Sequence, residues 1–225
     1  MRDYSFDVDF LLHPLSSVLA KAGNTRVVSS VSLSDTVPSH VVSGGWLTAE
    51  YSLLPASTST RFKRERGGVS GRTAEIQRII GRSLRMSVDM QAFSGYTMTV
   101  DCDVLDADGG TRTTSINGGM LAVAIACKRM QERGIVEKSP LKSWIGAISG
   151  GVIDGEIVID LDYEHDSRAE SDFNFVFAEN GRIIEIQGTA EHEPLDEKVF
   201  LELFAKSRDC ALQLIKKMKT VAGLQ

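Results

Sequence analysis

The chain of 225 residues is predicted to adopt an α+β fold, with helices packed on mixed sheets. Three observations lead to this class. Alternating apolar and polar residues, typical of half-buried strands, occur early in the chain and again late. Between them lie an apolar stripe at helical spacing and an Ala-rich apolar run. A last amphipathic segment follows, so the order is strands, helices, strands and a helix.

Composition indicates an ordinary globular protein, with residues 1–225 forming a single domain of two closely packed halves. Hydrophobic residues make up 42% and charged residues 24% of the chain, and no apolar run approaches the roughly 20 residues that span a bilayer. The N-terminus, MRDYSFDVDF, is acidic where a secretory signal would be basic, so we expect a cytoplasmic protein without a membrane partner. Cys102, Cys127 and Cys210 are expected to be reduced core thiols.

The net charge of −5 conceals a strong asymmetry. From Arg61 to Arg85 there are eight basic residues and two acids, a balance of +6. From Gly151 to Glu197 there are two basic residues and fourteen acids, a balance of −12. The first region is suited to phosphates and the second to cations.

The first part of the chain is expected to contain strands and a long loop. Residues 1–17 show no clean period. Val18–Lys21 and Arg26–Leu33 are predicted to form a hairpin around a Gly-Asn turn, and Trp46–Leu53 a further strand. Pro55–Gly71 is rich in Ser, Thr, Arg and Gly, which predicts an exposed loop; such long loops are usually functional or mobile.

A helix follows, for which Thr73 is the predicted N-cap and Glu75 a first-turn residue. Its apolar stripe advances in steps of four, through Ile76, Ile80, Leu84 and Val88. Three arginines, Arg78, Arg82 and Arg85, are placed on the opposite face by the same geometry. That face is either a solvated surface or a contact for RNA.

The segment Asp101–Gly119, DCDVLDADGGTRTTSINGG, is expected to form the functional site. Its first half alternates as a half-buried strand, and a buried helix is predicted over Ser115–Arg133. The Gly-rich turn between them would present backbone N–H groups and the helix dipole to an anion, and Arg112 adds further donors. An ordinary strand-to-helix turn explains the two glycines equally well.

The second half is predicted to form a hairpin of Trp144–Ile153 and Glu156–Leu161 around an Asp-Gly turn. Two further strands, paired around an Asn-Gly turn, and a helix capped by Asp196 complete it. Between the strands lies an acid-rich loop that contains Asp166 and ends at Asp172, where a Phe-rich strand begins. A carboxylate there requires a partner, and Mg²⁺ suits such ligands. Alternatively, backbone N–H groups satisfy Asp172 and solvent satisfies Asp166. An anion cradle, a basic loop and paired carboxylates together favour phosphoryl transfer.

Five stretches closely resemble the bacterial ribonuclease PH family: GWLTAEYSLLP (Gly45–Pro55), GRTAEIQRIIGRSLR (Gly71–Arg85), DCDVLDADGGTRTTSI (Asp101–Ile116), DLDYEHDSRAESDFN (Asp160–Asn174) and EIQGTAE (Glu185–Glu191). They occur in order, with matching gaps, over about residues 18–221, whereas residues 1–17 diverge. The resemblance implies a phosphate-dependent 3′→5′ exoribonuclease, a tRNA nucleotidyltransferase that trims the 3′ end of tRNA precursors. It also implies the ribosomal protein S5 domain 2-like fold and a homo-oligomer, a ring hexamer of three dimers.

The resemblance also implies roles for individual residues. Its phosphate site, which would hold inorganic phosphate as co-substrate, falls on Arg72, Gly110, Thr111 and Arg112. Its catalytic acidic pair falls on Asp166 and Asp172, which would hold Mg²⁺ or supply the acid. Arg61 and Arg64 match arginines of the family's RNA-gripping loop.

The chain departs from the family along the implied RNA path. MRDYSFDVDF stands in place of an Arg-rich opening segment, and Ser39 and Ala56 replace residues that are usually basic. The loops at 36–44 and 66–71 are shorter than usual. We therefore expect retained chemistry with a weaker hold on structured tRNA.

Two other functions fit parts of the sequence. A non-catalytic, RNA-binding subunit of an exosome-like ring would share the fold, but it has no need for Arg72, Arg112, Asp166 and Asp172 together. A small-molecule kinase could use the Gly-rich turn, but the sequence has no GxxxxGK[ST] loop and its basic loop would be unexplained. The phosphorolytic exoribonuclease is therefore the predicted function.

Overall fold

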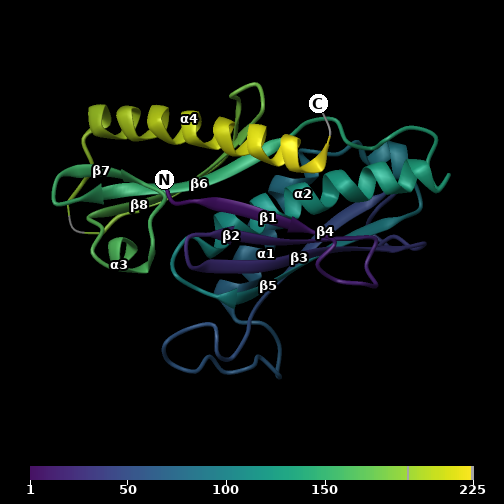
Figure 1. Cartoon of the computed structure of the whole chain (residues 1–225), viewed down its shortest axis with the longest axis horizontal. Helices are drawn as coiled ribbons and strands as arrows, with labels where there is room; N and C mark the ends of the chain where they lie inside the picture. The colour runs from purple at the N-terminus through teal and green to yellow at the C-terminus, as the bar shows by residue number, and fades with distance from the viewer. Residues whose placement is uncertain (192, 224–225) are drawn as a thin grey trace.

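A computed structural model describes residues 1–191 and 193–223 and places a central helix between two sheets (Figure 1). The first sheet has the strand order β1-β2-β3-β5-β4, in which β4 runs parallel to β5 and the other neighbours are antiparallel. Its strands are β1 (Tyr4–Val8), β2 (Ser16–Ala22), β3 (Thr25–Ser34), β4 (Trp46–Leu53) and β5 (Thr97–Asp106). The loop of residues 54–70 projects from this sheet (Figure 1).

The second sheet is antiparallel throughout, with the order β7-β6-β8-β9. Its strands are β6 (Ile145–Ile153), β7 (Glu156–Ile159), β8 (Ser171–Ala178) and β9 (Ile183–Ala190). The Phe residues of β8 stack along one face and pack on α4, including the pair Phe177 and Phe204. The other face of β8 carries buried Val176 and, towards the start of the strand, Asp172 and Asn174, because successive strand side chains alternate between faces.

Four α-helices and a short 3-10 helix, η1 (Met90–Phe93), accompany the sheets in the described part of the chain. The helices are α1 (Gly71–Arg85), α2 (Thr111–Glu132), α3 (Tyr163–Asp166) and α4 (Glu197–Ala222). Helix α1 packs on β4, α4 packs on β6, and α2 contacts strands of both sheets. None of these helices is long and apolar enough to cross a membrane.

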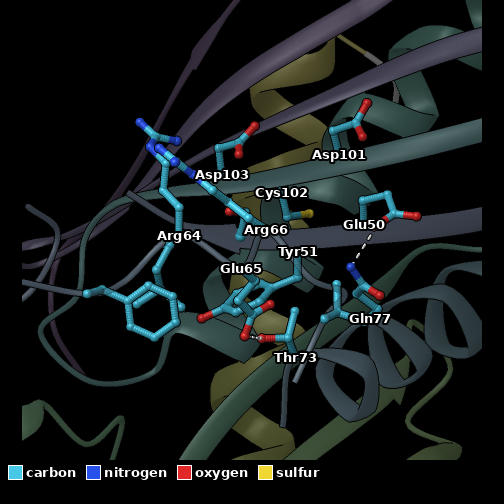
Figure 2. A pocket seen from close by; sticks show the side chains of 14 residues that line it. Glu50, Tyr51, Arg64, Glu65, Arg66, Thr73, Gln77, Asp101, Cys102 and Asp103 are labelled. Carbon is cyan, nitrogen blue, oxygen red and sulfur yellow. Dashed lines mark hydrogen bonds between the residues drawn. The ribbon is translucent and has the colours of Figure 1, made fainter. Parts of the chain in front are cut away.

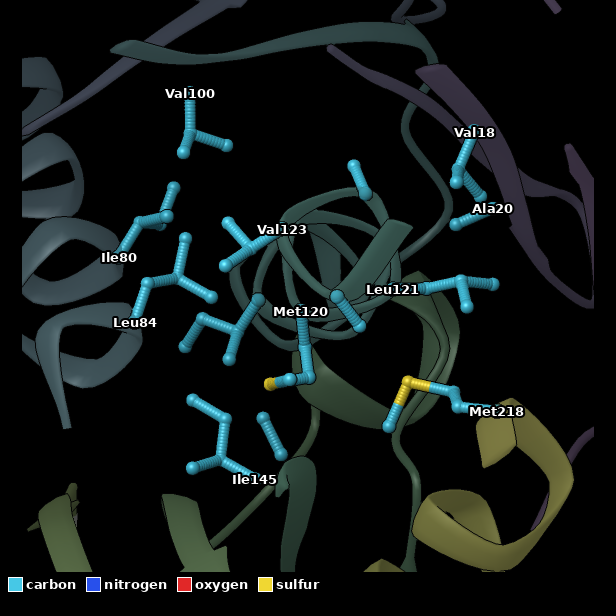
Figure 3. Close-up of a cluster of buried hydrophobic side chains, with 14 of the residues drawn as sticks. Val18, Ala20, Ile80, Leu84, Val100, Met120, Leu121, Val123, Ile145 and Met218 are labelled. Carbon is cyan, nitrogen blue, oxygen red and sulfur yellow. The ribbon is translucent and has the colours of Figure 1, made fainter. Parts of the chain in front are cut away.

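Helix α2 is surrounded by protein because apolar side chains approach it from every side. Figure 3 shows β2 residues on one flank, α1 residues on the other, and Ile145 and Met218 beside Met120. Polar Asn117 is also fully buried in this helix. Its side-chain amide donates to the Ala147 carbonyl and accepts from the Ala147 N–H, both at 2.8 Å, so α2 is fixed in register against β6.

Most predicted elements are confirmed, including the three hairpin turns, the strand Trp46–Leu53, and Asp196 as the cap of α4. Cys102 and Cys127 are buried free thiols, whereas Cys210 is only partly buried.

Four predictions were wrong in detail. The N-cap of α1 is Ser70, whose hydroxyl accepts the Thr73 N–H, and the first turn has no acid. Helix α1 ends at Arg85, so buried Val88 lies beyond it. Helix α2 begins at Thr111, four residues before the predicted start at Ser115, because left-handed Gly110 already serves as its N-cap. Residues 4–8, which had no predicted structure, form β1.

The arginine face of α1 is neither simply solvated nor free for RNA. Arg82 forms an ion pair with Glu185 of β9, and Arg85 stacks over the Trp46 ring while donating to the Leu47 carbonyl at 3.0 Å. Arg78 alone remains exposed without such a contact among the described residues. Two of the three arginines therefore join α1 to the sheets.

Candidate active site

The six residues predicted to bind phosphate or catalyse the reaction all line one cavity of about 1210 Å³. They come from three separate places: the start of α1, the turn from β5 into α2, and the segment from α3 to β8. The residues are Arg72, Gly110, Thr111, Arg112, Asp166 and Asp172. The fold thus brings together groups that are up to a hundred positions apart in the sequence.

The turn before α2 is shaped to present backbone N–H groups. Gly109 and Gly110 have φ angles of +72° and +62°, a left-handed conformation that favours glycine. Thr113 Oγ1 donates to the Gly110 carbonyl at 2.9 Å and fixes the first turn of α2. The first N–H groups of any α-helix lack intrahelical acceptors, and no acid in this first turn competes for them. The turn therefore has the geometry with which helix N-termini receive anions.

Gly109 is also the point where this turn meets the acidic loop. A Cβ atom on Gly109 would lie 2.4 Å from the carbonyl carbon of Asp162 and 2.7 Å from the Leu161 carbonyl oxygen. Both neighbours are backbone atoms, which cannot rotate away. The absence of a side chain at Gly109 thus permits close approach of the two segments.

Replacing Gly109 by alanine is expected to destabilise the chain more than replacing Gly155, where φ is +78° and an added Cβ meets nothing within 4 Å. Gly155→Ala should lower the free energy of unfolding by about 1–2 kcal/mol, the cost of left-handed backbone in a residue with a Cβ. Gly109→Ala carries the same strain and the backbone clash in addition. Urea titrations of both variants measure the difference; equal losses would contradict the close approach.

Arg72 and Arg112 occupy the second positions of α1 and α2 and face the same cavity. No hydrogen bond or ion pair within the described residues involves either guanidinium group, so their donors are available. Tyr51 lines the same cavity, and its Oη donates to Thr111 Oγ1 at 2.9 Å. Burial raises the pKa of Tyr51, and the bond to Thr111 and the two arginines oppose that rise. Tyr51 is therefore a neutral hydrogen-bonding group, and sequence reasoning did not find it.

Asp166 and Asp172 lie close enough to influence each other. Desolvation raises the pKa of Asp172, and the negative charges of Asp166 and Glu191 raise it further. Desolvation also raises the pKa of Asp166, although Arg112 and Arg72 pull it in the opposite direction. A backbone hydrogen bond and the charge of Arg112 oppose the rise in the pKa of Asp172. A backbone N–H therefore satisfies part of this carboxylate, as the alternative interpretation expected, whereas no side chain among the described residues donates a hydrogen bond to Asp166 or Asp172.

Arg61 and Arg64 lie apart from this cavity. Arg64 lines a neighbouring cavity of about 320 Å³, and Arg61 lines neither of the two. Figure 2 shows Arg64, Glu65 and Arg66 from the projecting loop in the second cavity, together with Glu50, Asp101 and Asp103 from β4 and β5. Tyr51, Leu53, Phe62 and Thr73 line both cavities, so the two adjoin.

In comparison with known proteins, two family models match the chain, one over each half. The sequence model of the 3′ exoribonuclease family, domain 1, matches residues 1–128, and that of domain 2 matches residues 144–210. The chain belongs to the RNase PH family. The first match begins at residue 1, although the resemblance was expected to begin only near Val18.

Curated members of the RNase PH family are similar over nearly their full length. Ribonuclease PH of Syntrophomonas wolfei is 46% identical over 228 residues, which cover 100% of this chain and 95% of the relative. Ribonuclease PH of Bacillus subtilis is 45% identical over 229 residues, covering 99% and 93%. The chain is accordingly a phosphorolytic 3′→5′ exoribonuclease, as its motifs predicted.

Solved structures related to the RNase PH family share the fold. An Archaeoglobus fulgidus exosome with RNA bound to the active site matches with a TM-score of 0.84 at 21% identity, over 97% of this chain and 89% of that one. Rice (Oryza sativa) Rrp46 matches with a TM-score of 0.79 at 18% identity, over 99% and 95%. Similarity at this level concerns the architecture, and it agrees with the expected S5 domain 2-like fold.

Proposed function

We propose that inorganic phosphate binds at the start of α2, on the N–H groups of Thr111 and Arg112, and is clamped by Arg72 and Arg112. The planar forks of two arginines suit a tetrahedral oxyanion better than the point charge of lysine. Gly110 supplies the left-handed backbone, with φ at +62°, from which α2 begins. The observation that supports this site most strongly is that two unpaired guanidinium groups and a helix N-terminus face one cavity.

The bound phosphate would attack the last phosphodiester of an RNA strand in line. A bond forms between a phosphate oxygen and the terminal phosphorus, and the bond from that phosphorus to the 3′ oxygen of the preceding nucleotide breaks. A nucleoside diphosphate leaves, and the shortened RNA takes up a proton on its new 3′ oxygen. Asp166 and Asp172 line the same cavity as the turn of Gly109 and Gly110 before α2, here called the phosphate turn. The raised pKa of Asp172 suits a carboxyl that supplies that proton.

The same two carboxylates fit Mg²⁺. They are oxygen ligands, their like charges repel each other, and both line the cavity that would also hold phosphate. No group of three or more His, Cys, Asp or Glu side chains is arranged as a metal site in the described residues, so the protein would supply few of the ligands. Bound there, Mg²⁺ would neutralise charge that develops on the reacting phosphates.

The RNA is proposed to reach the cavity past the projecting loop, with Arg61 and Arg64 contacting its backbone rather than its bases. Natural substrates would be the 3′ ends of tRNA precursors. Because the loops at 36–44 and 66–71 are short and Ser39 and Ala56 are uncharged, the affinity for folded tRNA should be low. Phosphorolysis of a short single strand and of a tRNA precursor should then differ in efficiency; equal, family-like efficiency on both would refute this part.

One assay separates the proposed function from its alternative, a non-catalytic RNA-binding subunit. The chain is incubated with an oligoribonucleotide and Mg²⁺, with and without inorganic phosphate, and products are separated by chromatography. Nucleoside diphosphates that appear only with phosphate support the proposal. RNA binding without any product would support the alternative.

We also propose that the chain works in the cytoplasm as a ring of three dimers. Six chains of 24.5 kDa would have a mass of about 147 kDa. Light scattering on a size-exclusion column measures this directly, and a mass of one or two chains would count against the ring.

A further inference from the structure

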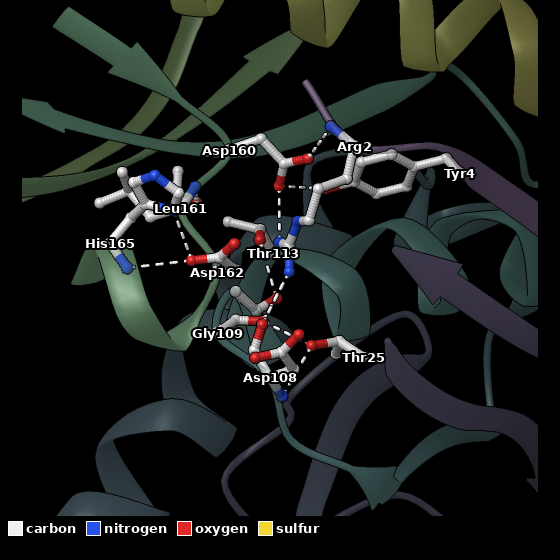
Figure 4. Close-up of polar contacts among 12 residues, drawn as sticks. Arg2, Tyr4, Thr25, Asp108, Gly109, Thr113, Asp160, Leu161, Asp162 and His165 are labelled. Carbon is white, nitrogen blue, oxygen red and sulfur yellow. Dashed lines mark hydrogen bonds and ion pairs between the residues drawn. The ribbon is translucent and has the colours of Figure 1, made fainter. Parts of the chain in front are cut away.

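The segment before and within β1 ties together the two halves of the site (Figure 4). Arg2 lies between the phosphate turn and the start of the acidic loop, and its guanidinium donates to both. One nitrogen, Nη2, donates to Asp160 Oδ1 at 2.7 Å, and the other, Nη1, donates to the Asp108 carbonyl at 2.8 Å. Asp108 precedes the two glycines of the turn, and Asp160 begins the loop that leads to Asp166.

Asp160 has a buried, fully hydrogen-bonded carboxylate and a strained backbone. Its carboxylate is fully buried, and it accepts from the Arg2 backbone N–H at 2.8 Å and from Tyr4 Oη at 3.0 Å as well as from the Arg2 guanidinium. Its φ angle is +70°, in the left-handed region that residues with a Cβ disfavour. Such strain persists only where surrounding contacts fix the backbone, and it concentrates at functional sites.

The backbone around Asp160 is fixed from the sheet side too. Its N–H donates to the Ser149 carbonyl at 2.7 Å, and the next N–H, of Leu161, donates to Ser149 Oγ at 3.1 Å. Immediately after this, Asp162 caps α3 by accepting the His165 N–H at 2.9 Å. The path from Asp160 to Asp166 is therefore short and rigid.

The phosphate turn is fixed in a matching way. Thr25 Oγ1 donates to the Gly109 carbonyl at 2.7 Å and accepts the Asp108 N–H at 3.0 Å. An added Cβ on Gly110 would lie 2.7 Å from Arg2 Nη2, so the guanidinium packs directly under the turn. Neither Arg2 nor Asp160 is among the residues that line the described cavity, so neither touches the substrate.

We infer that Arg2 is a positioning residue for phosphorolysis, which sets the distance between the phosphate turn and the Asp166–Asp172 pair by bridging Asp108 and Asp160. This inference rests on the proposed assignment of the turn to phosphate and of the acids to catalysis. A two-armed planar guanidinium is required because it must donate in two directions at once. A lysine can pair with Asp160 but cannot bridge to the Asp108 carbonyl in the same geometry.

The test compares Arg2→Met and Arg2→Lys with a matched control, Arg26→Met. Arg26 pairs with Asp106 at the end of β5, near the same turn, but the pair is exposed and does not touch the turn's backbone. Thermal midpoints, kcat and KM for phosphate are measured with an oligoribonucleotide at a temperature where circular dichroism shows each variant folded. Calorimetric titration with inorganic phosphate alone provides a readout that does not depend on turnover.

Both Arg2 variants should lose about 10- to 100-fold in kcat/KM for phosphate and bind phosphate more weakly, because displacement of reacting groups by about 1 Å has effects of this size. Arg26→Met should stay within about twofold of the wild type. Compared with Arg2→Met, Arg2→Lys should restore most of the lost thermal midpoint but little of the lost kcat/KM for phosphate. A purely structural role predicts instead that stability and kinetics recover together, and that result would overturn the inference.

Two further outcomes are distinguishable. If Arg2→Met does not fold, Arg2→Lys alone decides, because it keeps a positive charge beside the buried carboxylate of Asp160. If the wild type releases no nucleoside diphosphate, the proposed function has failed, and the phosphate affinities still decide the inference. Equal affinities in Arg2→Lys and Arg26→Met would refute the positioning role.

Discussion

Replacing Asp172 by asparagine is expected to lower kcat by about 10²- to 10⁴-fold, the usual contribution of a positioned acid or base, without unfolding the chain. The charge of Asp172 is unfavourable in the folded state, because desolvation and the neighbouring charges of Asp166 and Glu191 raise its pKa. A carboxyl whose pKa is raised by folding lowers stability as pH rises from its unfolded pKa to its folded pKa. Above that window the asparagine variant, which carries no charge, should be at least as stable as the wild type.

This stability difference has a definite pH dependence. It should be present at neutral pH and disappear below the unfolded pKa of aspartate, roughly 3.9, where both states of the wild type are protonated. Thermal unfolding in chelator-containing buffer at several pH values measures it. A large loss of stability at neutral pH in Asp172→Asn would mean that the carboxylate has a structural partner, and its role as a free catalytic group would then be wrong.

Asp101→Asn is the matched control. Asp101 is also a half-buried carboxyl whose pKa is raised by desolvation, with Asp103 and Glu50 adding to the rise, but it lines only the neighbouring cavity. We expect its kcat to stay within about twofold of the wild type. If Asp101→Asn reduced turnover as strongly as Asp172→Asn, the site would have to be extended into the second cavity.

Replacing Arg112 by lysine is expected to reduce kcat/KM for phosphate by about 10- to 150-fold, because one hydrogen bond between charged groups, worth about 1.5–3 kcal/mol, is lost. The positive charge remains, so a pure charge role would predict a small change. Steady-state kinetics over a range of phosphate concentrations, at saturating oligoribonucleotide, separates KM from kcat.

Arg78→Lys provides the control for this substitution. Arg78 lies on α1, like Arg72, but on its exposed face and away from both cavities. Its replacement should leave phosphate KM unchanged within about twofold. If Arg112→Lys behaved like Arg78→Lys, the phosphate would have to bind elsewhere than on the turn before α2.

Local sequence was sufficient to predict most elements because their signals are local. Asp-Gly and Asn-Gly turns between apolar runs specify hairpins, and Asp196 caps α4 with its own side chain. Two of the three helix boundaries that were wrong, the starts of α1 and α2, involve caps whose choice depends on backbone conformation. Gly110 starts α2 because it adopts a left-handed conformation, and Ser70 starts α1 although Thr73 has the same capping chemistry.

The site could be predicted only in part for a related reason. Arg72, Arg112 and the proposed catalytic pair, Asp166 and Asp172, belong to recognisable motifs, so their convergence could be expected. The Arg2–Asp160 pair joins residues 158 positions apart, and Arg2 lies in a segment without any clear pattern. Contacts of that range depend on the packing of two sheets around α2, which no short stretch of sequence encodes.

The central claim is that free phosphate is the nucleophile and is held by the turn before α2. The most direct test incubates the chain with an oligoribonucleotide, Mg²⁺ and phosphate labelled with ¹⁸O. The masses of the products are then measured by mass spectrometry. We expect nucleoside diphosphates that retain every labelled oxygen of the phosphate, and about 10- to 150-fold slower formation of them by Arg112→Lys at low phosphate. Nucleoside monophosphates without label, formed by attack of water, would contradict the claim.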